Sequence, residues 1–332
     1  MVNVDRVAFS RRSVLGAGAG AALLGIAGCG GEDTAGSSKG TTRRVPGALG
    51  TAEVPVPAKR VVSVGQYRDT DAAVAVGVVP LLSPDLSAFV PGGVAPWVTE
   101  RLGDRKLEIL DFTKLPYEKI AALRPDVILA TDRLSLKDEY ARLSEIAPTV
   151  SWANGYNKDD WRTTTTRVGA ALGRSAQARR QIELTDKAIA KAKADNPDLR
   201  GLTFTLGPVT GDGTVNTINS TADASVRFLA QLGMKLSPKV TGLPGSAIPG
   251  RAKVSPERLD VLDADVVMLT YNTPQARKKL EADDLFRKIP AVRRGAYIGL
   301  DLPPALAIGF PSALSIRYGL EQIVPKIRAA IG

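Results

Sequence analysis

The side chains that most often carry chemistry are scarce in this sequence. Its 332 residues include one cysteine, Cys29, and no histidine. Histidine is the commonest ligand of transition metals and the usual general base near neutral pH, so its absence excludes a histidine-ligated metal site and a Ser-His-Asp triad. A single cysteine excludes an intramolecular disulfide and a thiolate metal cluster. Paired carboxylates could still catalyse, but no motif points to them. We therefore expect no enzymatic activity, no metal ligated by the protein and no resident cofactor.

The first 28 residues have the layout of an export signal. A basic start holds Arg6, Arg11 and Arg12, and an uncharged apolar run (VLGAGAGAALLGI) follows at 14–26. A membrane-spanning helix needs about 20 apolar residues, so this run is too short to span a bilayer. A basic start followed by a short apolar run is typical of a secretory signal that is removed from the mature protein.

Cys29 stands directly after this run. The segment 26–29 (IAGC) resembles the lipobox of bacterial lipoproteins, and 10–15 (SRRSVL) resembles the twin-arginine motif for export of folded proteins. This resemblance implies that Cys29 carries lipid, such as palmitate, and becomes the new N-terminus. We expect a chain anchored on the extracytoplasmic face of the cell membrane. Residues 29–53 begin with a stretch rich in Gly, Ser and Thr, which predicts a flexible tether.

The net charge of +10 is spread along the chain, and aromatic residues make up only 5% of it. A basic protein of this kind suits anionic lipid headgroups or an anionic small ligand. Without a long Lys/Arg block, nucleic-acid binding has little support.

Short apolar runs alternate with short helical segments in two parts of the chain, 54–158 and 196–332. Such alternation predicts two α/β lobes with parallel strands. The expected strands are 60–65, 78–82, 107–110, 127–130 and 149–152 in the first lobe, and 203–206, 214–218, 266–270 and 296–300 in the second.

Between the lobes, 159–195 shows no strand pattern. Asp159 and Asp160 can start a helix there, and Asn196-Pro197 can end it. One continuous helix would be roughly 50 Å long and could bridge the lobes. Gly169 and Gly173 weaken it locally.

The segment 117–131 aligns without gaps with 256–270. Glu118 then matches Glu257, and Asp126 matches Asp265. Each copy predicts a short helix, a turn at the aspartate and a buried strand. Either the two lobes are related, or helix-turn-strand units look alike because they obey the same packing rules.

Five segments resemble the substrate-binding lipoproteins of iron-siderophore ABC importers, and the similarity covers most of 54–331. They are 57–63 (PAKRVVS), 117–128 (YEKIAALRPDVI), 143–150 (LSEIAPTV), 254–259 (VSPERL) and 310–315 (FPSALS). The resemblance implies the α/β fold of class III periplasmic binding proteins, with two Rossmann-like lobes joined by one long rigid helix. It also implies a monomer that captures a ferric siderophore and delivers it to an ABC permease for iron uptake. The metal arrives inside the chelate, so no protein ligand for it is needed.

The resemblance assigns permease docking to Glu118 and Glu257, which otherwise are solvated carboxylates favoured in a first helical turn. Ligands of α/β sheets bind at the carboxyl ends of strands, where arginines could pair with an anionic chelate and aromatic rings could cover its apolar flanks. The candidates, each of which could instead be an ordinary loop or packing residue, are Tyr67, Arg68, Trp97, Arg133, Tyr271, Asn272 and Phe310. Trp152, Tyr156 and Trp161 are weaker candidates.

Two alternatives stay open. One is a heme- or cobalamin-binding lipoprotein of the same fold, in which Tyr67 or Tyr271 could be an axial phenolate for heme. The other is an envelope interaction protein that kept the fold and lost transport.

Overall fold

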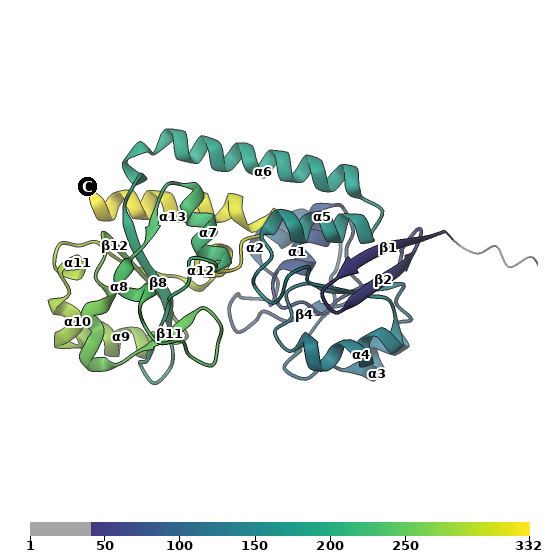
Figure 1. The fold of residues 1–332 in the computed structure, drawn as a ribbon, viewed down its shortest axis with the longest axis horizontal. Helices are drawn as coiled ribbons and strands as arrows, with labels where there is room; N and C mark the ends of the chain where they lie inside the picture. The colour runs from purple at the N-terminus through teal and green to yellow at the C-terminus, as the bar shows by residue number, and fades with distance from the viewer. Residues whose placement is uncertain (1–40) are drawn as a thin grey trace, which may run out of the picture. The chain divides into compact units, whose positions relative to one another are not determined.

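The computed structural model describes residues 41–332, which begin with a β-hairpin (Figure 1). Strands β1 (Thr42–Gly47) and β2 (Gly50–Pro55) pair antiparallel, with Thr42 opposite Pro55. Val45, Ala52 and Val54 are buried. The prediction of a flexible tether is therefore wrong for 42–53, because these apolar side chains fix the hairpin on the first lobe. The signal peptide, Cys29 and the start of the tether lie outside the described residues.

The first lobe is built on parallel strands that are covered on both faces. Strands β3 (Val61–Ser63), β6 (Val127–Ala130) and β7 (Thr149–Ser151) pair in the order β3-β6-β7. A bridge from Val62 to Leu82 leads to the short pair β4 (Ser83–Pro84) and β5 (Ile109–Leu110). All four residues of β6 are buried, as expected of a central parallel strand. The helices are α1 (Arg68–Ala75), α2 (Pro96–Leu102), α3 (Tyr117–Ala122) and α4 (Leu136–Ile146).

The second lobe has a mixed sheet in the order β11-β9-β8-β12-β13. Strands β8 (Thr203–Val209), β12 (Val266–Tyr271) and β13 (Tyr297–Leu300) are parallel, and β10 (Lys235–Leu236) joins β8 in the same direction. Strands β9 (Val215–Ile218) and β11 (Arg251–Val254) are antiparallel to their neighbours. The helices are η1 (Pro197–Leu199), α7 (Ala224–Gln231), α8 (Pro238–Thr241), η2 (Pro256–Leu262), α9 (Pro274–Ala282), α10 (Asp284–Lys288), α11 (Pro290–Arg293), α12 (Leu302–Gly309) and α13 (Ser315–Ile331).

The linker consists of two helices, not the one continuous helix predicted over 159–195. Helix α5 (Trp161–Ala171) packs on the first lobe, and α6 (Ser175–Asp195) contacts α1 and α5 as well as α7 and α13 (Figure 1). The helical conformation is interrupted at Gly173, whose φ of +70° lies in the left-handed region that glycine adopts readily. At Gly169, an added Cβ would overlap Ala178, so its missing side chain lets α5 and α6 approach closely. No helix in residues 41–332 is both long and apolar enough to cross a bilayer.

The repeat has a structural counterpart in its two aspartates. Asp126 Oδ2 accepts hydrogen bonds from the amides of Lys59 (2.7 Å) and Arg60 (2.8 Å), just before β3. Asp265 Oδ2 accepts from the amide of Thr203 (2.6 Å), where β8 starts. Each carboxylate thus fixes the start of the strand beside its own, which gives the matched aspartates the same role in both lobes.

Candidate functional site

The loop after β3 is folded around a buried carboxylate at the carboxyl end of the sheet. Asp132, which follows β6, accepts hydrogen bonds through Oδ2 from the amides of Tyr67 (2.7 Å) and Arg68 (2.8 Å). Asp69 Oδ2 accepts from the Thr131 amide at 2.8 Å. A Cβ on Gly65 would overlap the carboxylates of both Asp69 and Asp132, so only glycine fits there. Burial, together with the nearby charge of Asp132, raises the pKa of Asp69.

Tyr67 and Phe310 bring the two lobes together at this loop. Their rings stack with centroids 3.9 Å apart, and Phe89 meets Tyr67 edge-on at 5.8 Å. Tyr67 starts α1 in the first lobe, whereas Phe310 ends α12 in the second. Burial, and then the neighbouring Tyr156 and Asp132, raises the pKa of Tyr67 well above its usual range.

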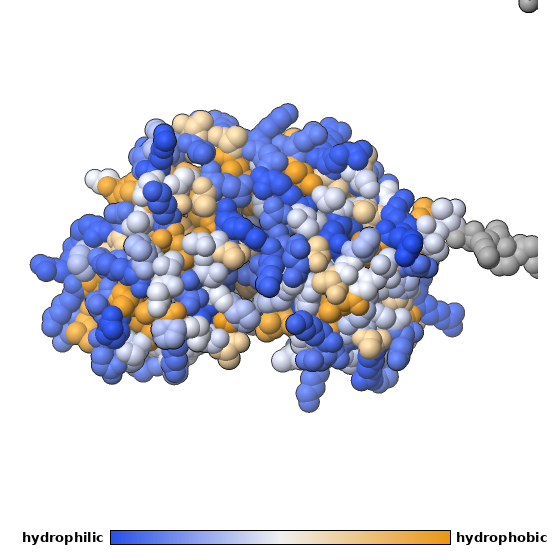
Figure 2. All heavy atoms as spheres, viewed as in Figure 1, coloured by the Kyte–Doolittle hydropathy of each residue, from blue (hydrophilic) through white to orange (hydrophobic). Residues whose placement is uncertain are grey.

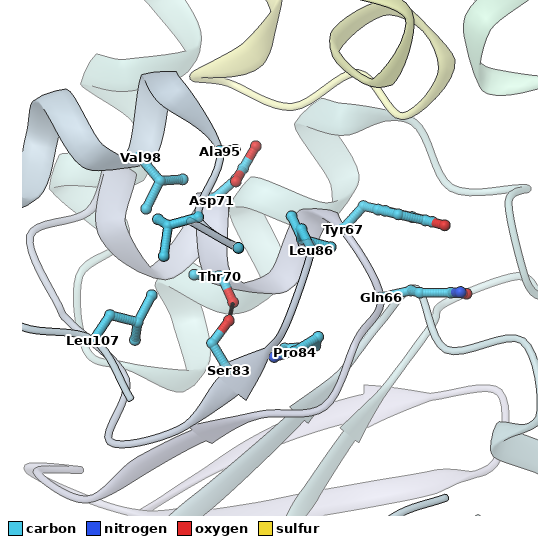
Figure 3. Close-up of a pocket in the computed structure, with 12 residues that line it drawn as sticks. Gln66, Tyr67, Thr70, Asp71, Ser83, Pro84, Leu86, Ala95, Val98 and Leu107 are labelled. Atoms are coloured by element: carbon cyan, nitrogen blue, oxygen red, sulfur yellow. Dashed lines mark hydrogen bonds between the residues drawn. The ribbon is translucent and has the colours of Figure 1, made fainter. Parts of the chain in front are cut away.

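A small pocket lies beside Tyr67 within the first lobe (Figure 3). At its base the hydroxyl groups of Thr70 and Ser83 meet at 2.5 Å, and Leu86 and Val98 add apolar walls. Its interior holds about one water molecule, so it cannot enclose a chelate of any size. The surface between the lobes, at the carboxyl ends of the strands, stays the predicted place for a ligand. Figure 2 shows that the lower edge of the molecule is hollowed there.

A second contact between the lobes is centred on Asp71 of α1. Its Oδ2 accepts from Trp97 Nε1 at 2.6 Å and from Ser312 Oγ at 2.5 Å, and Ser312 precedes α13 in the other lobe. Burial raises the pKa of Asp71 to about 7, although both hydrogen bonds lower it. Trp97 is only 6% exposed and packs near Tyr318, with ring centroids 5.2 Å apart. The indole is thus part of the junction between the lobes and not of an open surface.

A third contact joins the loop after β7 to the start of α7. Asn157 Nδ2 donates to Asp223 Oδ2 at 2.9 Å, and Arg251 Nη1 donates to the same oxygen at 2.6 Å. Tyr156 lies close to this group, and burial raises the pKa of its hydroxyl to about 12. Asn157 and Arg251 were not predicted from the sequence. Arg251 opens an antiparallel edge strand, whereas the rule applied to the sequence considered only the carboxyl ends of parallel strands.

The arginines predicted for the cleft are engaged with the protein. Arg68 is 1% exposed, its Nε is 3.8 Å from Asp132 Oδ2 and its Nη1 donates to the Asp159 carbonyl at 3.2 Å. Arg133 is 6% exposed and donates from Nη2 to Glu139 Oε1 at 2.7 Å, with a further bond from Nε to the same carboxylate. Both side chains fold inward because a carboxylate stands beside each, the buried Asp132 beside Arg68 and the half-buried Glu139 beside Arg133.

The other candidates lie in different surroundings. Tyr271 is 7% exposed, its hydroxyl is 2.5 Å from that of Tyr297, and Tyr297 donates to Glu281 at 2.9 Å. Burial raises the pKa of Tyr271 to about 12. Asn272 is exposed directly after β12. The structure therefore brings Tyr67 and Phe310 together and leaves Asn272 exposed to solvent. The remaining candidates, which are buried, are Arg68, Trp97, Arg133 and Tyr271. A ligand role for each of the seven stays a prediction.

Glu118 and Glu257 are both exposed in the first turn of their helices. The side chain of Glu118 is 89% exposed, and its Oε1 lies 3.6 Å from Arg142 Nη2. Hydrogen bonds from its own amide and from Ser255 lower the pKa of Glu257, so this carboxylate is charged at neutral pH. Their docking role stays a prediction, but both are accessible to a partner.

The family model described as "Periplasmic binding protein" matches residues 76–303. A periplasmic solute binding protein from Mycobacterium smegmatis is similar in structure, with 31% identity, a TM-score of 0.74 and coverage of 88% of this chain and 99% of that one. PiaA from Streptococcus pneumoniae, solved with ferrichrome, has 24% identity, a TM-score of 0.74 and coverage of 87% and 98%. SirA from Staphylococcus aureus, solved with staphyloferrin B, has 22% identity, a TM-score of 0.70 and coverage of 86% of this chain and 98% of that one. These last two likenesses concern the fold alone. The comparison with curated proteins gives no significant match. With its two α/β lobes and a family model that spans most of both, the chain belongs to the periplasmic binding protein family.

Proposed function

We propose that this protein captures a ferric siderophore outside the cytoplasm and delivers it to the permease of an ABC importer. The observation that carries the proposal is the meeting of aromatic side chains from both lobes at the strand ends, where Tyr67 stacks on Phe310. Aromatic faces at the mouth of a two-lobed cleft can cover the apolar flanks of a chelate. Proteins of this fold have been solved with ferrichrome and with staphyloferrin B, which supports the same class of cargo.

The scarcity of metal-binding side chains suits a cargo in which the iron is already fully chelated. The whole sequence lacks histidine, and residues 41–332 hold no group of three or more Asp, Glu, His or Cys side chains placed to bind a metal ion. Fe(III) inside a siderophore needs no protein ligand, so recognition falls to the outer surface of the chelate.

The aromatic contact can be tested by substitution. Phe310→Ala removes one ring of the stack without adding charge, and Tyr67→Ala removes the other. Each should weaken binding of the best ferric siderophore by about fivefold, since an aromatic contact contributes about 1 kcal/mol. Tyr140→Ala removes an aromatic ring of α4, which contacts the hairpin at Gly50, and should leave the affinity unchanged. Equal affinities in all three variants would contradict this placement of the ligand.

Delivery is proposed to use Glu118 and Glu257 as charged contacts with the permease, while lipid on Cys29 holds the protein at the membrane. Complementary charges at an interface fix the docking register and speed association. Glu118→Arg with Glu257→Arg should abolish siderophore-dependent iron uptake and leave siderophore affinity intact. The matched control is Glu145→Arg with Glu321→Arg, which reverses two other exposed carboxylates, on α4 and α13. Unchanged uptake in the first double variant would favour the role in envelope interactions.

Lipidation of Cys29 can be tested by measuring the mass of the mature protein and its distribution between the membrane fraction and the medium. Cys29→Ala should give a chain without acyl groups that is released into the medium, whereas the parent chain stays with the membrane fraction. Release of both proteins would contradict the anchor.

A further inference from the structure

We propose that the cleft selects a ferric chelate of zero net charge, of the trihydroxamate type, over a highly anionic triscatecholate. This inference rests on the proposed function and specifies its cargo. Three catecholates, each with two negative charges, leave Fe(III) as a triply negative complex. Three hydroxamates, each with one, neutralise it. The charges around the cleft decide between these classes.

Three arginines, Arg68, Arg133 and Arg251, each lie beside a carboxylate. Arg68 lies beside Asp132, and Arg133 makes two bonds to Glu139. Arg251 donates to Asp223, and the side chains of these two residues are 13% and 1% exposed. Guanidinium groups that are buried and neutralised in this way offer little net positive potential to an anion.

The surroundings of Tyr156 show the same balance. The charged groups that act on its hydroxyl are Asp132 and Asp223, which are negative, and Arg68 and Arg251, which are positive. The nearby Asp159 adds a further carboxylate, which is occupied by the amides of Ala153 (2.6 Å) and Asn154 (3.0 Å).

Two further cations must be weighed. Lys158 lies on the same loop, but its side chain is exposed to water, where salt screens its attraction. Arg227 of α7 has Nε and Nη2 buried without a hydrogen-bond partner among the described residues. Within residues 41–332, Arg227 is thus one cation without a carboxylate partner, whereas Arg68 and Arg251 both lie beside carboxylates. A triply negative chelate would therefore meet mostly paired charges in the cleft.

The uncharged groups of the same region suit a neutral chelate. The phenols of Tyr67 and Tyr156 are protonated at neutral pH, as tyrosines ordinarily are, and burial raises their pKa further, so both can donate hydrogen bonds to chelate oxygens. Asn157 Oδ1 is buried without a donor among the described residues, and this acceptor would repel an anion. The ring of Phe310 offers apolar area next to them.

The test compares ferrichrome and ferrioxamine E, which are neutral, with ferri-bacillibactin, a triscatecholate, by isothermal titration of the mature protein. The parent protein should bind at least one of the neutral chelates about tenfold or more tightly than ferri-bacillibactin. Asp223→Asn leaves Arg251 without its carboxylate, while asparagine still caps α7 as aspartate does. Binding of ferri-bacillibactin to this variant should improve by about tenfold, as expected when a guanidinium becomes free to pair. Asp195→Asn makes the same change in net charge at the far end of α6 and should alter neither affinity.

Salt dependence gives a second measurement that needs no variant. Affinity for the tightest chelate should stay within about twofold between low and high salt, since a neutral ligand makes no ion pair to screen. Tighter binding of ferri-bacillibactin by the parent protein, or a tenfold loss of affinity in salt, would overturn the selection for neutral cargo and leave the siderophore role intact. If these three chelates and the ferric carboxylate-type siderophores all fail to bind, the proposed function itself fails.

Discussion

The carboxyl group of Asp71 should make the stability of this protein depend on pH in a specific way. It is fully buried between the lobes, where its Oδ2 accepts bonds from Trp97 and Ser312. Burial raises its pKa from 3.8 to about 7. The folded state therefore keeps a proton that the unfolded chain releases, and the free energy of unfolding falls as the pH rises from about 4 to about 7.

The size of the effect follows from the shift. The pKa of Asp71 differs by about three units between the folded and the unfolded state. This difference lowers the free energy of unfolding by roughly 4 kcal/mol between pH 4 and pH 8. In Asp71→Asn, the amide oxygen can accept both hydrogen bonds and no proton is taken up. Relative to the parent protein, the variant should therefore gain up to about 4 kcal/mol over this interval.

Urea unfolding of both proteins at half-unit steps from pH 4 to pH 8 measures this difference. The control is Asp212→Asn, because Asp212 is an exposed carboxyl whose pKa is lowered to about 2 by hydrogen bonds from Thr210 and Thr214. Stability relative to the parent should be independent of pH above pH 5 for this control. Parallel pH profiles for Asp71→Asn and the parent would refute the reasoning.

Two further predictions concern positions where the fold is tightly constrained. Gly65→Ala places a methyl group against the carboxylates of Asp69 and Asp132 and should cost about 1–3 kcal/mol by urea unfolding, whereas Gly242→Ala has open space and should cost little. Asp126→Ala and Asp265→Ala should each cost about 1–2 kcal/mol, because each leaves the start of a strand without its acceptor, and Asp138→Ala, at an exposed position of α4, should be close to neutral. A large loss in a control, or none in the tested variants, would contradict these assignments.

Much of the fold was predictable because buried parallel strands are apolar throughout. The segments 127–130 and 266–270 were expected as buried strands, and both are central in their sheets. The gapless match of Asp126 with Asp265 pointed to a shared role, which the strand-start hydrogen bonds supply. The break at Gly173 was less predictable, because glycine inside a helical pattern can either be tolerated or end the helix.

The hairpin and the orientation of the site residues depend on contacts between distant parts of the chain. Residues 42–55 contain several Gly, Pro and Arg residues and resemble a linker until Val45 and Val54 are seen against the first lobe. Arg68 and Arg133 do follow strands, as predicted. Their direction, however, depends on Asp132 and Glu139, and sequence position at a strand end says nothing about such partners.

The central claim is best tested by isothermal titration of the mature protein with ferric siderophores, their iron-free forms, hemin and cobalamin. We predict saturable one-to-one binding of at least one ferric siderophore with a dissociation constant of about 1 µM or tighter, the affinity that about 8 kcal/mol of binding free energy gives. Tight binding of hemin or cobalamin, with no heat from any ferric siderophore, would contradict it.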